Sequence, residues 1–311
     1  MNLTVVLAFT ANVLVALAKT AAAVLTGSAS MVAESAHSWA DTGNEVFLLV
    51  ADRRSRRRPD HSHPHGYGRE AYVWSMFAAV GLFVAGAAVS IIHGVQELGA
   101  KEGNESFTLA YVVLAVAFVL EGTSFLQAYR QVHRGAESAD QTVLHTALST
   151  SDPTLRAVFA EDSAALVGIL LAAGGIGLHQ VTGSPVYDAI GSILVGILLA
   201  VIAFVLIDRN RRFLVGESVT PEIQTLVRDR ILAMPEVASV GYLHIEFVGP
   251  HRLYLVASVD LIGDESESVV ADRLRSLERR IEAEDAVVEA VLTVSRPGRP
   301  PDADLDDVVP E

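Results

Sequence analysis

Six apolar stretches recur along the first two thirds of the chain, separated by short polar connections. An α-helix needs about 20 apolar residues to cross the roughly 30 Å hydrocarbon core of a bilayer. The pattern therefore predicts an α-helical membrane domain of six transmembrane helices. The expected spans are Leu3–Leu25, Met31–Val50, Val73–Val95, Phe107–Tyr129, Leu155–Leu178 and Val186–Ile207.

The first apolar stretch is expected to be a retained helix and not a cleaved signal peptide. It lacks the basic start of a signal peptide, and Asn12 and Lys19 interrupt its apolar run. A short TGS turn then leads directly into the second stretch. These features favour a transmembrane hairpin at the start of the chain.

The pattern changes after Gly216 to one typical of a soluble domain. A helix is expected to begin at Pro221, because Thr220 stands in the capping position before it. The order helix, strand, strand, helix, strand predicts a small α+β domain whose helices cover one face of a sheet. The first helix is expected to end at about Ala233. The strands are expected at Val237–Val248, Arg252–Leu261 and Val287–Ser295, and the second helix at about Ser266–Glu284.

Composition and charge support this division of the chain. Hydrophobic residues make up 51% of the 311 residues, and the mean hydropathy of +0.38 is typical of a membrane protein. The net charge is −14, and the segment 217–311 holds 20 Asp and Glu against 9 Arg. We therefore expect a transmembrane domain at 1–212, a cytosolic domain at 213–297 and a disordered acidic tail at 298–311.

Basic residues predict the orientation in the membrane, because Lys and Arg near helix ends remain on the cytoplasmic side. Twelve arginines fall in the second and fourth connections and after the sixth span, whereas only Lys101 falls on the opposite side. Both termini are therefore expected in the cytoplasm. The protein is expected to be a multi-pass protein of a bacterial inner (plasma) membrane. Its expected partners include the lipid bilayer and no nucleic acid.

Four polar residues follow one stripe of the second span at helical spacing: Glu34, His37, Asp41 and Asn44. A charged group at mid-bilayer costs about 3 kcal/mol even on lenient insertion scales, so the stripe needs a compensating role. His and Asp one turn apart offer nitrogen and oxygen donors to Zn²⁺ or a similar ion. The alternative is a polar seam that only joins helices by hydrogen bonds.

The fifth span opens with a second pair of acidic residues, Glu161 and Asp162. Adjacent side chains point about 100° apart on a helix, so usually only one can face a shared ion. The pair also fits the acidic start of an interfacial helix. Glu121 lies inside the fourth span, where a helix-to-helix hydrogen bond and a functional role are both open.

The chain resembles the cation diffusion facilitator family. The matching segments are TGSASMVAESAHSWADTGNEV, HPHGYGREAY, EDSAALVG, YDAIGSILVGILLA and GYLHIEFVGPHRLYLVASVDL, in the family's order from Leu3 to Pro297. The resemblance implies a homodimer with a ferredoxin-like cytosolic domain. It also implies export of divalent metal from the cytosol in exchange for protons, without a prosthetic group.

The resemblance assigns His37, Asp41 and Asp162 to the family's transported-metal ligands. Where the family commonly has a His or Asp one turn before the last acid, this chain has Val158. Glu161 is the nearest replacement, and the adjacent Glu-Asp pair is similar to the zinc transporter nine branch. Zn²⁺ is the expected cargo, with Mn²⁺ or Fe²⁺ as alternatives because carboxylates suit harder ions.

The connection before the third span carries His61, His63 and His65 beside Asp60. A loop of this kind binds metal in many family members, although Tyr67 stands where a His is often found. These histidines are therefore candidates for a secondary metal site. The alternative is a solvated loop whose arginines meet anionic lipid headgroups.

In the cytosolic domain, His244 matches a position that binds metal in some family members. Its companion positions hold Ala257 and Ser295, which offer no imidazole. A binuclear regulatory site is therefore not expected in this domain. His244 and His251 are expected at the surface or at an interface.

The ligand types themselves predict proton coupling, because metal and protons compete for the same lone pairs. An imidazole, with an ordinary pKa of about 6.5, suits such an exchange near neutral pH. The alternative is a membrane metal sensor or scaffold without net transport. An enzyme is not expected, because the chain contains neither an HExxH motif nor a nucleophile constellation.

Overall fold

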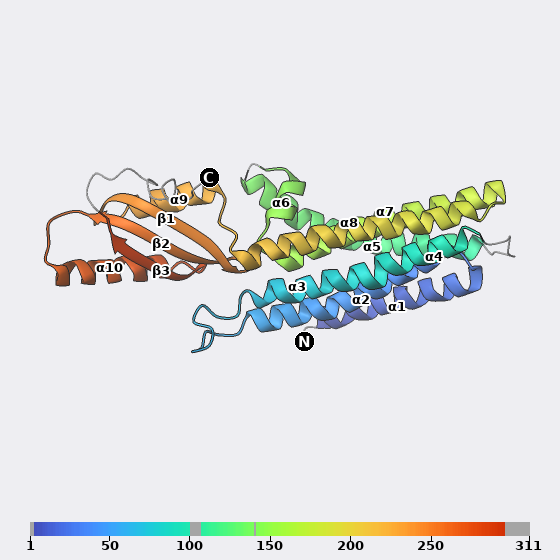
Figure 1. Cartoon of the computed structure of the whole chain (residues 1–311), viewed down its shortest axis with the longest axis horizontal. Coiled ribbons are helices and arrows are strands. Elements are labelled where there is room, and N and C mark those ends of the chain that lie inside the picture. Colours follow the sequence, from blue (N-terminus) through green and yellow to red (C-terminus); the bar gives the residue numbers. More distant parts are fainter. Residues whose placement is uncertain (1–2, 100–106, 140, 296–311) are drawn as a thin grey trace. The chain divides into compact units, whose positions relative to one another are not determined.

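The computed structural model describes residues 3–99, 107–139 and 141–295 (Figure 1). The chain divides into two compact units. The first unit comprises the chain up to Arg53 together with Ala71–Arg211. The second comprises Arg54–Glu70 together with the chain from Arg212 onward. The expected tail at 298–311 and Lys101 lie outside the described residues.

The first unit is a bundle of long helices (Figure 1). Five helical segments of the described chain are long and apolar enough to cross a membrane: α1, α3 through α4, α5, α7 and α8. The protein is thus a multi-pass membrane protein. The helices are α1 Leu3–Thr26, α2 Ala29–Ser55, α3 Glu70–Gly81, the π-helix η1 Leu82–Ala88, α4 Val89–Glu97, α5 Phe107–Ala139, α6 Val143–Ser149, α7 Pro153–Thr182 and α8 Val186–Val215.

Helix α2 is also predicted to be a span, but it is not among these five long, apolar segments. It has 27 residues, which is ample length for a bilayer, but its polar side chains make it less apolar than the other five. Its polar residues are mostly buried, among them Glu34, His37 and Asn44. The helix is therefore polar on the side that faces the other helices.

Glycines allow α8 to lie close to both η1 and α4. A Cβ at Gly94 would lie 2.9 Å from the carbonyl oxygen of Ala189, and one at Gly196 would lie 2.9 Å from that of Ala87. Both distances are shorter than real Cβ contacts allow. The backbones thus touch as small residues permit in membrane helices.

Arg156, one of the arginines that predicted the orientation, is buried at the start of α7. Its guanidinium donates to the carbonyl of Thr150 and to Oδ1 of Asn210 on α8, each at 2.7 Å. Asn210 in turn donates to Ser75 Oγ on α3. A buried charge needs such partners, and here they tie three helices together.

The second unit contains the predicted order of helices and strands. These are α9 Pro221–Leu232, β1 Val237–Gly249, β2 Arg252–Leu261, α10 Glu267–Glu282 and β3 Val287–Val294. The strand order is β1-β2-β3, with β1 antiparallel and β3 parallel to β2. One apolar core joins both helices to the sheet, through Ile231 of α9, Leu277 of α10 and residues such as Leu243, Leu255 and Leu292.

The loop before α3 belongs to this second unit and packs on its sheet. A Cβ at Gly68 would lie 2.5 Å from the carbonyl oxygen of Val248, so only glycine fits at this contact. Arg69 and Glu246 of β1 form an ion pair of 2.9 Å beside it. The loop is thereby held against the β1–β2 hairpin.

Candidate metal centre

Helix α2 places the four predicted polar residues along one stripe inside the bundle. Glu34, His37 and Asn44 are buried, and Asp41 is 18% exposed. The Nε2 atom of His37 lies 3.4 Å from Oδ2 of Asp41, one turn further along α2. The spacing seen in the sequence thus brings an imidazole and a carboxylate together.

The acidic pair of α7 faces two different helices. Asn44 on α2 donates through Nδ2 to both carboxylate oxygens of Glu161. Ser124 on α5 donates through Oγ to Oδ2 of Asp162 at 2.7 Å. The 100° separation between adjacent helical side chains therefore directs each carboxylate to its own neighbour.

Both acids nevertheless line the same cavity, which has a volume of about 310 Å³. Asp41, Glu121 and Val158 line it as well. Val158, one turn before Asp162, therefore faces the space that the carboxylates share. The cavity lies among α1, α2, α5 and α7. Its other lining residues are Ala11, Asn12, Val15, Ser38, Glu45, Leu48, Leu120, Thr123, Ser124 and Gln127.

Several buried polar atoms around this cavity have no hydrogen-bond partner. They include both ring nitrogens of His37, Oδ1 of Asp41, Oδ1 of Asn44 and Oε2 of Glu45. Buried polar atoms are normally paired, because an unpaired one costs about 1–3 kcal/mol. One nitrogen ligand and several oxygen ligands suit a divalent cation such as Zn²⁺.

The donors do not form a closed coordination shell. Among residues 3–99, 107–139 and 141–295, no three His, Asp or Glu side chains converge on one point as metal ligands. The structure thus brings His37, Asp41, Glu161 and Asp162 to one region without closing them around a single centre. Binding a cation there requires new rotamers of some of these side chains.

Glu34, predicted as an accessory residue, has an ion-pair partner. Its Oε2 lies 2.9 Å from Nζ of Lys19 on α1, and both side chains are fully buried. Its other oxygen, Oε1, has no hydrogen-bond partner. Glu34 therefore lies on the ligand stripe but is bound to another charge.

Sequence reasoning missed four polar residues of this region. They are Lys19, which in the sequence is only an interruption of the first span, Ser124, Asn12 and Glu45. Asn12 donates to Glu45, one turn beyond Asp41 on the cavity wall. The available signal was the same as for α2: a polar residue inside an apolar span needs a partner.

The three loop histidines are not brought together. His65 pairs with Glu289 of β3 at 2.9 Å and lies 4.8 Å from the ring of Tyr254. His63 stacks on Tyr67 with ring centroids 4.0 Å apart. His61 is exposed in the same loop. Two of the three imidazoles thus contact other groups of the second unit.

Tyr67 stands where a histidine was expected, and it orders the loop. Its hydroxyl donates to Oδ2 of Asp60 at 2.7 Å, while the backbone N–H groups of His63 and Ser62 donate to Oδ1. The hydrogen bond from Tyr67, followed by that from the His63 backbone, holds the pKa of Asp60 below its usual range. This carboxylate is therefore engaged in a turn.

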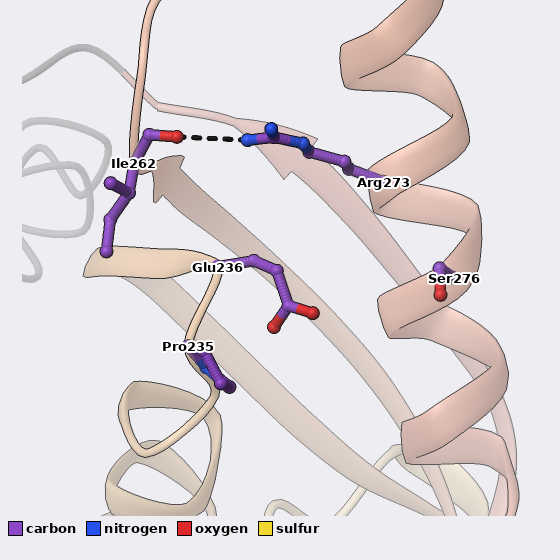
Figure 2. A pocket seen from close by; sticks show the side chains of 5 residues that line it. All are labelled: Pro235, Glu236, Ile262, Arg273 and Ser276. Atoms are coloured by element: carbon purple, nitrogen blue, oxygen red, sulfur yellow. Dashed lines mark hydrogen bonds between the residues drawn. The ribbon is translucent and has the colours of Figure 1, made fainter.

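The sheet domain holds a further hollow of about 420 Å³, between the end of α9, the end of β2 and α10. Figure 2 shows Arg273 donating to the backbone carbonyl of Ile262 at its rim. Glu236 is the one carboxylate among its lining residues, and Arg280 binds it at 2.9 Å. This donor set does not fit a metal ion.

His244 is 41% exposed and lies 3.8 Å from Glu246 on the same strand. Ala257, its predicted companion position, is fully buried in the core of the sheet. Its side chain packs among apolar residues. The structure thus shows His244 at the surface without a second imidazole at the companion positions.

Comparison with known proteins identifies the family of this chain. The family profile of the cation efflux transmembrane domain matches residues 5–215. The chain belongs to the cation diffusion facilitator family. Metal tolerance protein C4 of Arabidopsis thaliana is 37% identical over 233 residues, and the mitochondrial proton-coupled zinc antiporter SLC30A9 of Mus musculus is 35% identical over 240 residues. The predicted family and its zinc transporter nine branch are confirmed.

The coverage differs between relatives. The two matches above take in 75% and 77% of this chain, but only 51% and 42% of the relatives' own lengths. An uncharacterized transporter of Methanocaldococcus jannaschii is 23% identical over 295 residues, which is 93% of this chain and 96% of that protein. The cation diffusion facilitator described here thus spans about half of its more similar relatives.

Proposed function

We propose that this protein moves Zn²⁺ out of the cytosol in exchange for protons. The observation that carries the proposal is the cavity lined by Asp41, Glu161 and Asp162 beside His37, whose ring nitrogens have no hydrogen-bond partner. These groups bind either a divalent cation or protons, so loading one releases the other. A relative of this chain is named as a proton-coupled zinc antiporter, which favours Zn²⁺ over Mn²⁺ and Fe²⁺.

His37 and Asp41 supply the ligands from α2 in this proposal, and Asp162 and Glu161 supply those from α7. Asp162 is the more accessible acid, because Ser124 engages only one of its oxygens. Glu161 becomes a ligand only after it leaves Asn44, whose amide donates to both of its oxygens. The fourth ligand is therefore recruited as the cation binds. Glu121 stays an accessory carboxylate on the cavity wall.

The arrangement of the whole chain belongs to the same proposal. Helix α2 serves as the sixth span, since its polar side faces the bundle and needs no lipid contact. The membrane domain is the one predicted at 1–212, except that the loop Arg54–Glu70 belongs to the second unit, and the cytosolic domain is the ferredoxin-like one predicted at 213–297. The family resemblance implies a homodimer. The arginines of the connections predict that both termini lie in the cytoplasm, and a bacterial inner membrane stays our prediction.

Flux measurements test this function and separate it from a sensor. The full chain is reconstituted into vesicles with a zinc-sensitive dye inside, and a pH gradient is imposed. Transport predicts Zn²⁺ movement that reverses when the gradient is reversed, whereas a sensor or scaffold predicts binding without movement. The Asp41→Ala variant is the matched control for leak.

A further inference from the structure

The buried pair of Lys19 and Glu34 lies outside the proposed set of transport ligands. Both side chains are fully buried, and their charged atoms are 2.9 Å apart. Removing two charges from water costs several kcal/mol per ion, and replacing such a pair by apolar residues is often neutral or stabilising. Stability alone therefore does not explain why this pair occupies the bundle.

The pair lies one helical turn beyond the residues of α1 and α2 that line the cavity. On α1 the cavity is lined as far as Val15, and Lys19 follows one turn later. On α2 the lining begins at Ser38, and Glu34 precedes it by one turn. A cation that moves from the cavity toward the start of α2 therefore meets Glu34 after His37.

Glu34 already binds one cationic group, the ammonium of Lys19, as a metal ligand would bind an ion. Lys19 holds one oxygen, while Oε1 is buried without a hydrogen-bond partner. Gly168 of α7 makes room for this oxygen, since a Cβ there would lie 2.7 Å from it. Gly168 follows Glu161 by two turns on the same face of α7. Oε1 of Glu34 therefore lies against that face, beyond the acidic pair.

His37 lies between Asp41 and Glu34 on the polar stripe of α2. It is one turn from Asp41 on one side and one turn from Glu34 on the other, and neither of its ring nitrogens has a hydrogen-bond partner. Residues three and four apart on a helix are neighbours on its surface. His37 can therefore share a cation with either carboxylate.

We propose that Glu34 is the ligand that receives the divalent cation from His37 on its way out, and that Lys19 occupies Glu34 in the meantime. The ammonium group is a tethered monovalent cation, which a divalent ion can displace because it attracts the carboxylate more strongly. While Lys19 stays in place, the pair closes the polar pathway on the side away from the cavity. This inference rests on the proposed transport function and adds an exit site to it.

Two double variants separate an exit ligand from a structural ion pair. Lys19→Met with Glu34→Gln removes both charges at similar volume. Lys19→Glu with Glu34→Lys keeps the ion pair but moves the carboxylate from α2 to α1. Helices α1 and α2 remain joined by the hydrogen bond between Thr20 and Ser35 in either variant. Ser192→Ala, which removes a buried hydrogen bond between α8 and α4, serves as the stability control.

Zn²⁺ flux is measured for each reconstituted full-length variant, together with its melting temperature and its dimer content. In both double variants we expect maximal flux to fall at least about tenfold while KM for Zn²⁺ stays within about twofold, because the cavity ligands are intact. Ser192→Ala is expected to keep wild-type flux. The charge-swapped variant is decisive, because a purely structural pair would transport at the wild-type rate.

Two results would overturn the exit site, and a third would refute the proposed function. Wild-type turnover in either folded double variant would overturn it. Loss of the folded protein in both variants would assign the pair a structural role and overturn it as well. A wild-type protein that moves no Zn²⁺ at all would instead refute the proposed function, so the two failures are distinguishable.

Discussion

Ser124 offers a sharp test of the metal site, because it contacts a proposed ligand without being a ligand itself. Its hydroxyl lies 2.7 Å from Oδ2 of Asp162 and fixes the direction of this carboxylate in the cavity. Groups that orient a metal ligand typically change metal affinity by about 10–100-fold when they are removed. Ser124→Ala is therefore expected to weaken Zn²⁺ binding without removing any ligand.

The structure favours the lower end of that range. A hydrogen bond to a charged group is worth about 1.5–3 kcal/mol in net terms. Asp162 lines an open cavity, so water can replace the lost hydroxyl. We therefore expect the Kd for Zn²⁺ to rise by about tenfold, which corresponds to about 1.4 kcal/mol.

Calorimetric Zn²⁺ titration of the purified full-length protein measures this change. Thr123→Val is the matched control, because Thr123 lines the same cavity but its hydroxyl donates to the Leu120 carbonyl of its own helix. The control is expected to keep wild-type affinity. An unchanged Kd in Ser124→Ala would mean that Asp162 either needs no orientation or does not bind the cation.

Three further predictions follow from the same contacts. Asp41→Ala and Asp162→Ala should each abolish Zn²⁺ flux while leaving dimers intact in size-exclusion chromatography, and residual wild-type flux in either would contradict the ligand assignment. Val158→His adds an imidazole on the cavity wall and should shift competition between Zn²⁺ and Mn²⁺ toward Zn²⁺ by about tenfold, since imidazole suits Zn²⁺ better; an unchanged ratio would place selectivity elsewhere. Tyr67→Phe removes the main cause of the lowered pKa of Asp60, so this pKa should rise toward 3.8 in an NMR titration. Because the folded pKa lies below that value, the stabilisation of the loop by Asp60 is complete above about pH 3.8 and is lost as the pH falls through the lowered pKa.

The architecture could be read from the sequence where a local periodicity dictates the structure. Apolar runs of bilayer length predicted the long helices, and alternation after Gly216 predicted β1 and β2 close to their observed ends. The stripe of Glu34, His37 and Asp41 also follows from helical geometry alone. In each case the signal lies within one element, so no information about its neighbours is needed.

Features that depend on neighbouring elements could not be read in this way. The sequence places Glu161 and Asp162 side by side, but only the packing of α7 between α2 and α5 decides that both line one cavity. The same holds for Lys19, which is an interruption of a span in the sequence and the partner of Glu34 in the fold. A buried charge is visible in a sequence, whereas its partner is fixed by the packing of distant segments, which no local pattern encodes.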